Sequence, residues 1–199
     1  MSGNIFIISG CSGSGKTTIV EEILKKRKNT TRAISFTTRP PRIGEKDAVD
    51  YYFIDKMRFI KKVETADFIE FSEVYGHLYG TTADSFRKTK EGLDVIKLID
   101  VQGAEKLRKL NIDAKFIFFE VPLAVLKKRL EGRGESETLE NKGSRGTKEL
   151  CSLSVKERLS HYNEELKYKK HFDFIVDTSG TAKDIQKNVK KVIQIMDSM

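Results

Sequence analysis

The chain has 199 residues, of which 33% are charged and 38% hydrophobic, and its formal net charge is +8. This length fits one α/β domain with one or two small inserts, and it permits a full buried core. The excess of basic residues fits a polyanion or a phosphate-rich small substrate, but it also fits an ordinary basic surface. The 2 cysteines lie far apart in the sequence, which excludes a disulfide framework or a cysteine-based metal site. No apolar stretch has the length of a signal peptide or a membrane span, so we expect a cytoplasmic protein that makes no membrane contact.

An apolar run at residues 5–8 is followed directly by the sequence GCSGSGKTT at residues 10–18. It fits the pattern G-x-x-x-x-G-K-[ST], in which the glycines let the backbone curl so that successive N–H groups point at phosphate oxygens. Lys16 is placed to reach the β- and γ-phosphates, and the hydroxyl of Thr17 to bind Mg²⁺. Residues 17–28 have helical composition, so a helix N-terminus adds its dipole at the same point. The motif predicts a nucleotide site made by the whole loop: Gly10, Cys11, Ser12, Gly13, Ser14, Gly15, Lys16, Thr17 and Thr18.

Strands and helices alternate through most of the remaining chain. A short strand is expected at residues 33–36, and the stretch after it contains two prolines that forbid a regular element. Strand patterns return at 95–101, 114–121 and 172–176, and helical patterns at 102–110, 123–130 and 182–196. Strands separated by helices of this length indicate a parallel sheet with right-handed crossovers. The expected fold class is α/β: a three-layer P-loop fold with a parallel central sheet.

Residues 37–85 interrupt this alternation and indicate a small mixed α+β insert carried on the main sheet. Short strands are expected at 51–54, 68–75 and 78–81, with a short helix at 56–63. The P-loop core is then expected to comprise residues 1–36, 86–131 and 155–199.

Residues 132–154 form a polar, Gly/Ser-rich segment with little periodicity. A loop of this length inside a compact domain is typical of a mobile lid. The alternative for its middle part is a disordered basic insertion. Arg129, Arg133 and Arg158 flank or enter the segment. Arginines beside a mobile loop, in a protein with a phosphate site, indicate a clamp that closes over the substrate.

The insert carries residues suited to a second phosphate, one that is not transferred. Arg39 and Arg42 lie three residues apart on a turn stiffened by prolines, and Tyr51 and Tyr79 add hydroxyl groups. Guanidinium groups match phosphate oxygens in pairs, so this set can hold the phosphate of an acceptor.

Polar residues near these arginines can read a purine base. The carboxylate of Glu70 can accept hydrogen bonds from N1–H and the 2-amino group of guanine, and a hydroxyl donor such as Ser35 or Thr81 can serve O6. Adenine would leave Glu70 unpaired, and such sites reject the wrong ligand strongly. The alternative for Glu70 is a solvated charge at a sheet edge. Asp100 ends a buried parallel strand, where ligands collect in α/β sheets.

The sequence resembles the guanylate kinase family over essentially the whole chain. The resemblance rests on the phosphate loop and on the segments SFTTRPPRIGEKDAVDYYF, DFIEFSEVYGHLYGT, IDVQG and LKKRLEGRG. It implies transfer of the γ-phosphoryl group of ATP to GMP or dGMP in purine nucleotide metabolism, with Mg²⁺ bound together with ATP. It also implies that Ser35, Glu70 and Thr81 read guanine; that Arg39, Arg42, Tyr51 and Tyr79 grip the GMP phosphate, with Asp100 on the GMP side; and that Lys16, Arg39, Arg129, Arg133 and Arg158 surround the transferring phosphate.

Three features depart from the family pattern. Leu98 stands where the family usually has an acidic residue, so Thr17 is the one Mg²⁺ ligand that the resemblance supplies. Asp177 replaces an asparagine near the adenine contact, and the lid segment is longer than usual. The alternatives are a catalytically inactive guanylate-kinase-like binding domain and a P-loop kinase with another phosphorylated acceptor. The intact phosphate loop argues against the first alternative. We expect no nucleic-acid partner, and a monomer or a homodimer.

Overall fold

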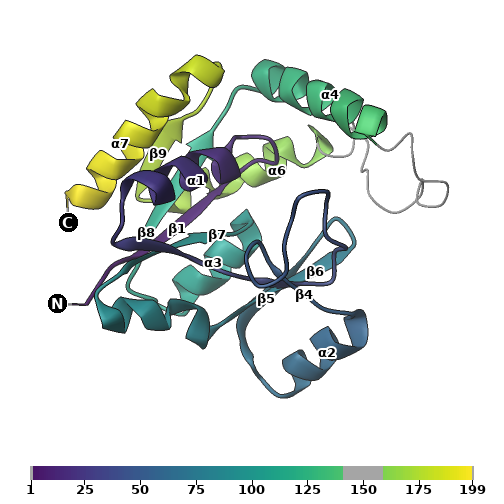
Figure 1. Ribbon diagram of the computed structural model, residues 1–199, viewed down its shortest axis with the longest axis vertical. Helices are drawn as coiled ribbons and strands as arrows, with labels where there is room; N and C mark the ends of the chain where they lie inside the picture. Colours follow the sequence, from purple (N-terminus) through teal and green to yellow (C-terminus); the bar gives the residue numbers. More distant parts are fainter. Residues whose placement is uncertain (1, 141–158, 199) are drawn as a thin grey trace.

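A parallel sheet runs through the centre of the computed structural model, which describes residues 2–140 and 159–198 (Figure 1). Its strands are β1 (Ile5–Gly10), β2 (Thr30–Ala33), β7 (Asp94–Leu98), β8 (Lys115–Glu120) and β9 (Phe174–Asp177), in the order β2-β7-β1-β8-β9. All the pairings within this sheet are parallel. The central strand β1 delivers the phosphate loop to the carboxyl edge of the sheet, where ligands bind in open α/β folds.

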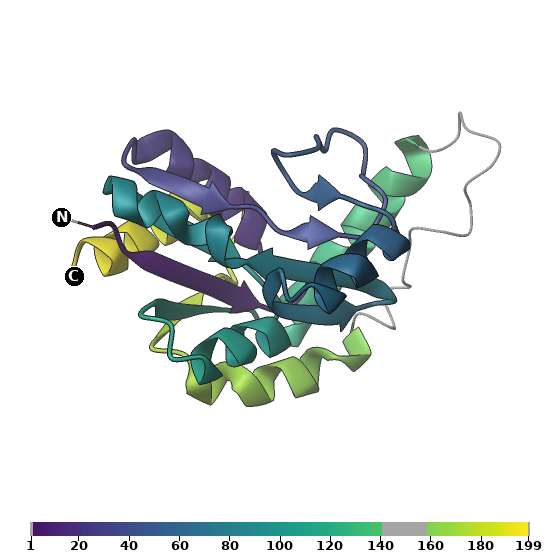
Figure 2. The same ribbon diagram turned by 90° about the horizontal axis from the view of Figure 1, so that it is seen from below.

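Helices cover both faces of this sheet, because successive side chains of a strand point to opposite sides. Helices α1 (Lys16–Lys26) and α7 (Ile185–Asp197) pack on the face that carries Phe6 and Ile8. Helix α3 (Val101–Lys109) and the 3₁₀ helix η1 (Ala83–Glu91) pack on the face that carries Ile7. Figure 2 shows α1 on one side of β1 and α3 on the other. The predicted three-layer α/β fold with a parallel central sheet is confirmed.

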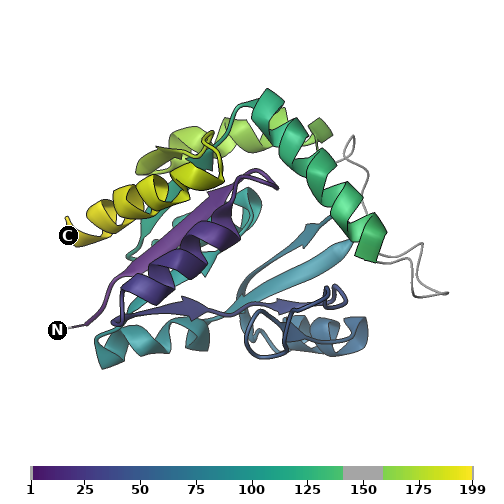
Figure 3. The same ribbon diagram turned by 45° about the horizontal axis from the view of Figure 1, so that its top comes forward.

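Helix α4 (Leu123–Glu140) extends past the phosphate loop (Figure 3). It packs with α6 (Tyr162–Lys167) around buried Cys11, and the 3₁₀ helix η3 (Tyr168–His171) follows α6. The expected end of α4 at residue 130 was wrong, because residues 132–140 of the predicted lid are helical. Glutamate, arginine and leucine in this stretch favour the helix enough to offset its two glycines. The rest of the predicted lid, residues 141–154, lies outside the described residues.

A second, mixed sheet projects from the first and has the order β4-β3-β6-β5. Its strands are β3 (Phe36–Thr37), β4 (Tyr52–Phe53), β5 (Phe68–Val74) and β6 (His77–Thr82). Strand β3 pairs parallel to β4 and antiparallel to β6, and β5 pairs antiparallel to β6. Helix α2 (Lys56–Glu64) lies against one face of this sheet (Figure 1).

The two faces of the small sheet differ in chemistry. One face is aromatic: the rings of Phe36 and Phe59 both pack against Phe68, and the Phe59 and Phe68 centroids lie 4.6 Å apart. The opposite face is polar, because Glu70 is paired with Thr81 and Ser72 with Tyr79 across β5 and β6. Helix α2 therefore packs on the aromatic face of the small sheet. The polar face is directed toward the carboxyl edge of the main sheet.

Other elements also differ from the expectations. The single strand expected at residues 33–36 is two strands, β2 and β3, one in each sheet, with Ser35 between them. The 3₁₀ helix η1 was not predicted, and a short 3₁₀ helix η4 (Ala182–Asp184) precedes α7.

No helix within the described ranges is both long and apolar enough to cross a membrane.

Candidate active site

The phosphate loop connects β1 to α1 and needs glycine at its first position. Gly10 has a φ of 141°, and a Cβ added there would lie 2.4 Å from the carbonyl oxygen of Phe119. Gly15 has a φ of 88° and immediately precedes α1. These left-handed conformations let the loop turn sharply at the helix N-terminus, where an anion is favoured.

Lys16 lies folded over this loop. Its Nζ donates hydrogen bonds to the carbonyl oxygens of Gly10 and Cys11, the latter at 2.9 Å, and approaches Ser14 Oγ at 3.4 Å. Thr17 and Thr18 are exposed on the first turn of α1. The ammonium is therefore held against the loop carbonyls, and Thr17 is open to solvent at the start of α1.

Cys11 is a buried residue of the phosphate loop, and Glu165 of α6 lies close to its thiol. Burial, followed by the nearby charge of Glu165, raises the pKa of the Cys11 thiol to about 12. A thiol with such a pKa stays protonated and is a poor nucleophile. Burial also raises the pKa of Glu165, against the opposing effect of the Lys16 charge. The Cys11 side chain belongs to the buried cluster that α4 and α6 form beside the loop.

Arg129 reaches from α4 to the phosphate loop. Its Nη1 lies 3.5 Å from the carbonyl oxygen of Gly13, and its Nη2 donates to the carbonyl oxygens of Thr178 and Gly180 at 2.6 and 2.5 Å. The guanidinium therefore joins the loop to the segment after β9. Arg133 belongs to the same helix, and Arg158 lies outside the described residues.

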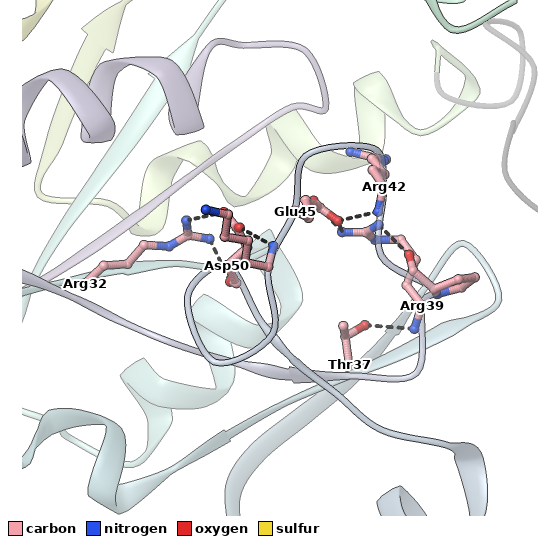
Figure 4. A network of polar contacts seen from close by, with 8 residues as sticks. Arg32, Thr37, Arg39, Arg42, Glu45 and Asp50 are labelled. Carbon is pink, nitrogen blue, oxygen red and sulfur yellow. Dashed lines mark hydrogen bonds and ion pairs between the residues drawn. The ribbon is translucent and has the colours of Figure 1, made fainter. Parts of the chain in front are cut away.

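Arg39 is buried on the loop that follows β3 and is held in a fixed direction (Figure 4). Its Nη2 donates to Glu45 Oε1 at 2.8 Å and to Oε2 at 2.9 Å, and its Nη1 donates to the carbonyl oxygen of Pro40 at 2.8 Å. The backbone N–H of Arg42 donates to the same carboxylate. Burial alone would raise the pKa of Glu45, but the hydrogen bonds from Arg39 and Arg42 outweigh it and lower that pKa.

Two tyrosines complete this basic cluster. The Arg39 guanidinium lies over the Tyr51 ring at 5.3 Å, and the rings of Tyr51 and Tyr79 meet edge to face at 5.9 Å. Burial raises the pKa of Tyr51, so its hydroxyl stays protonated and can donate. Arg42 is exposed on the same loop. The structure thus brings together the four residues Arg39, Arg42, Tyr51 and Tyr79.

Glu70 lies next to this cluster on the polar face of the small sheet and is 5% exposed. Its Oε1 accepts a hydrogen bond from Thr81 Oγ1 at 2.5 Å, whereas its buried Oε2 has no partner among the described residues. Burial raises the pKa of Glu70, while the Thr81 hydrogen bond and the charge of Lys97 oppose that rise. The alternative of a solvated edge charge is wrong, because the antiparallel pairing with Thr81 places this carboxylate inside the molecule.

Ser35 faces an unexpected partner. Its Oγ accepts a hydrogen bond of 2.6 Å from Lys97 Nζ, and Lys97 is fully buried on β7. Burial lowers the pKa of Lys97, although the charge of Glu70 opposes this. Ser35, Glu70 and Thr81 thus form a buried polar group with Lys97 behind it.

Asp100 caps the N-terminus of α3 and also contacts the small sheet. Its Oδ1 accepts from the N–H groups of Gln102 and Gly103, and its Oδ2 accepts from Ser72 Oγ at 2.6 Å. It therefore connects the carboxyl end of β7 to β5. A Cβ on Gly103 would lie 2.9 Å from Glu70 Oε2, so glycine there leaves room beside the unpaired oxygen.

Sequence reasoning missed Glu45 and Lys97. Glu45 gave no clear signal, because a glutamate in a polar loop is usually solvated. Lys97 gave one: it is the single charged residue within the apolar run at 95–99, which forms a strand with both faces covered.

Comparison with known proteins agrees with this geometry. The family model described as "Guanylate kinase" matches residues 2–198. The chain is 37% identical to a guanylate kinase of Thermotoga maritima over 201 aligned positions, which cover 100% of this chain and 88% of that protein. It is 39% identical to a guanylate kinase of Hahella chejuensis, with 83% of this chain and 84% of that one covered. The chain belongs to the guanylate kinase family.

This family membership confirms the resemblance inferred from the sequence. A solved guanylate kinase structure from Anaplasma phagocytophilum has a TM-score of 0.73, a sequence identity of 24%, and coverage of 99% of this chain and 86% of that one. That likeness concerns the fold, and it includes the parallel sheet and the second, mixed sheet that carries the polar cluster.

Proposed function

We propose that the protein transfers the γ-phosphoryl group of ATP to GMP or dGMP, giving ADP and GDP or dGDP. The observation that carries this proposal is the unpaired, buried Oε2 of Glu70. A buried carboxylate oxygen without a partner is costly, so a ligand that donates hydrogen bonds to it gains affinity. Guanine offers two such donors on one edge, N1–H and the 2-amino group, whereas adenine offers no donor at N1.

The acceptor phosphate would lie against Arg39, Arg42, Tyr51 and Tyr79. Tyr79 and Thr81 lie two residues apart on β6, so their side chains share one face of the small sheet. The phosphate group and the base of one nucleotide would therefore meet the same face. The Arg39 guanidinium is already fixed by Glu45, so little freedom is lost when it binds a phosphate.

The donor triphosphate would bind along residues 10–18. Backbone N–H groups of the loop and the N-terminus of α1 would hold its phosphates, and Lys16 would leave the loop carbonyls to reach their oxygens. The acceptor phosphate is itself the nucleophile, so the reaction is an in-line displacement without a covalent enzyme intermediate. The protein contributes alignment of the two nucleotides and neutralisation of charge.

Mg²⁺ fits this chain as a metal that is carried by the nucleotide. The described residues contain no group of three or more His, Cys, Asp or Glu side chains that could hold it, and the side chain of Leu98 offers no oxygen. The exposed Thr17 hydroxyl would be the protein ligand, and phosphate oxygens and water would complete the shell, as Mg²⁺ prefers. When bound, the metal neutralises charge on the phosphate oxygens during transfer.

Two segments would close over the nucleotides. We assign residues 37–85 to GMP binding and residues 132–154 to a lid, with Arg129, Arg133 and Arg158 next to the transferring phosphate. Closure would exclude water and so limit hydrolysis of ATP. Arg129 supports this assignment because its guanidinium already touches Gly13 of the phosphate loop.

The experiment that tests this function is an ADP-release assay with ATP and a panel of acceptors. We expect turnover with GMP and dGMP, and at least about 10⁴-fold lower kcat/KM with AMP, UMP and CMP, because none of these bases presents two adjacent donors to the Glu70 carboxylate. No turnover with any acceptor would indicate a binding domain, and a preference for another acceptor would indicate a different kinase.

A further inference from the structure

A fully buried lysine lies behind the proposed guanine site and has no part in the mechanism above. Lys97 is 0% exposed on β7, between Ile96, also 0% exposed, and half-buried Leu98. Its side chain shares a face of the strand with Val95, and the strand neighbours opposite it are Ile7 and Ala33. An ammonium group in such apolar surroundings is costly unless hydrogen bonds or charges compensate it.

Two groups of the proposed base site supply that compensation. Lys97 Nζ donates to Ser35 Oγ at 2.6 Å, and the negative charge of Glu70 attracts the ammonium, while Arg32 repels it. The parallel pairing of Ala33 with Lys97 explains the position, because Ser35 follows Ala33 by two residues at the end of β2.

This contact determines what the Ser35 hydroxyl can do. A hydroxyl has one proton to donate, and an ammonium group has no acceptor. Because Lys97 donates to Ser35 Oγ, the Ser35 proton is directed away from Lys97. The Thr81 hydroxyl cannot replace it, because Thr81 already donates its proton to Glu70 Oε1.

We infer that Lys97 is a positioning residue for base selection: it makes the Ser35 hydroxyl a donor toward position 6 of the bound purine. This inference rests on the proposed function. Guanine presents an acceptor, O6, at this position, whereas adenine presents an amino group that donates. With Lys97 in place, the amino group of a 6-aminopurine would face the Ser35 O–H group, so that two hydrogen-bond donors would point at each other. The positive charge of Lys97 also favours the carboxylate form of Glu70. Ser35 then presents a donor and Glu70 an acceptor, which is the pattern that guanine requires.

The test compares two acceptors that differ at one atom, GMP and 6-thio-GMP, whose sulfur accepts hydrogen bonds less well than oxygen. It is run at about pH 6, below the pKa of about 7 to which burial lowers Lys97, so that the lysine carries its proton. We expect Lys97→Met to reduce the ratio of kcat/KM for GMP to that for 6-thio-GMP by about tenfold, the size expected for one oriented hydrogen bond. The loss should fall mainly on KM for GMP, because Lys97 touches no reacting atom.

A double-mutant cycle with Ser35→Ala shows whether Lys97 acts through Ser35. In the Ser35→Ala background, Lys97→Met should leave the ratio unchanged. The matched control is Ile96→Val, a core change at the adjacent position of the same strand, which should leave the ratio at its wild-type value.

The outcomes separate this inference from the proposed function. Absence of GMP turnover in the wild type would overturn both. GMP turnover with an unchanged ratio in Lys97→Met, or an equal loss in the Ser35→Ala background, would overturn the inference alone. If Lys97→Met does not fold, the Lys97 Nζ resonance of the wild type decides: a hydrogen bond to Ser35 that persists with GMP bound supports the inference, and its loss on binding contradicts it.

Discussion

At the scale of single residues, the unpaired oxygen of Glu70 gives the clearest prediction. Glu70→Gln keeps the size of the side chain and an acceptor for Thr81, but it loses the negative charge and points an amide donor or a weaker acceptor at the base. We expect kcat/KM for GMP to fall about 100-fold, the cost of one charge-assisted hydrogen bond, and discrimination against AMP to fall with it. Steady-state assays with both acceptors measure this.

The control for this variant is Glu73→Gln, on the same strand but exposed. It should retain wild-type kinetics with GMP and the same discrimination against AMP. If Glu70→Gln matched this control, Glu70 would not be the residue that reads the base.

Lys97 makes a prediction about stability and pH. Burial lowers its pKa in the folded protein from 10.5 to about 7, with Glu70 opposing and Arg32 adding to the shift. Between these two values the unfolded chain binds more protons than the folded one, so folding stability rises with pH. Lys97→Met removes this dependence. The free energy of unfolding of Lys97→Met minus that of the wild type should therefore decrease from pH 7 toward pH 10, by at most about 1.4 kcal/mol per pH unit.

Urea unfolding at several pH values measures that difference. Ile96→Val carries no titrating group at the neighbouring position, so its difference from the wild type should not change with pH. A difference for Lys97→Met that stayed constant from pH 7 to pH 10 would mean that the lysine keeps its proton in the folded protein and would contradict this prediction.

At the scale of elements, the phosphate loop and its lysine act together. Lys16→Ala removes the ammonium that now bridges Gly10 and Cys11. We expect kcat to fall about 10³-fold, as when one charge-stabilising group is removed from an active site, with the circular dichroism spectrum preserved. The control is Lys25→Ala on the exposed side of the same helix, paired with Glu22. Near-normal turnover in Lys16→Ala would show that the loop does not hold the transferring phosphate.

Helix α2 supports the small sheet through one fully buried ring. Phe59 packs against Phe68 and Phe71, and Phe59→Ala should cost about 3–5 kcal/mol of stability, as for other buried aromatic side chains. Because the small sheet carries the proposed GMP site, KM for GMP should rise more than KM for ATP. Met57→Ala, on the same helix and 84% exposed, should change stability by less than about 0.5 kcal/mol. Equal changes in the KM values for GMP and ATP in Phe59→Ala would contradict the assignment of GMP binding to the small sheet.

At the scale of the whole molecule, the sequence predicted the parallel sheet and the family because both depend on local patterns. The phosphate loop sits between a strand and a helix, and the Arg39 and Glu70 segments each have a distinctive composition. What could not be predicted depends on tertiary contacts. The split of residues 33–36 into two strands follows from pairing with different sheets, and the fixing of Arg39 by Glu45 follows from a loop that folds back on itself.

The end of α4 and the position of Lys97 illustrate the same limit. Glycines at the start of the predicted lid indicated a loop, but the helix continues through them. Lys97 was visible as a lysine in an apolar strand, yet only the parallel pairing of β2 with β7 shows that it meets Ser35.

One face of the small sheet is proposed to hold a guanine nucleotide by its base and its phosphate together. A crystal structure of the protein with GMP tests this most directly. We expect N1 and the 2-amino nitrogen within about 2.7–3.2 Å of the Glu70 carboxylate, and the phosphate against Arg39 and Tyr79. GMP bound at any other place, or bound here with its base turned away from Glu70, would contradict it.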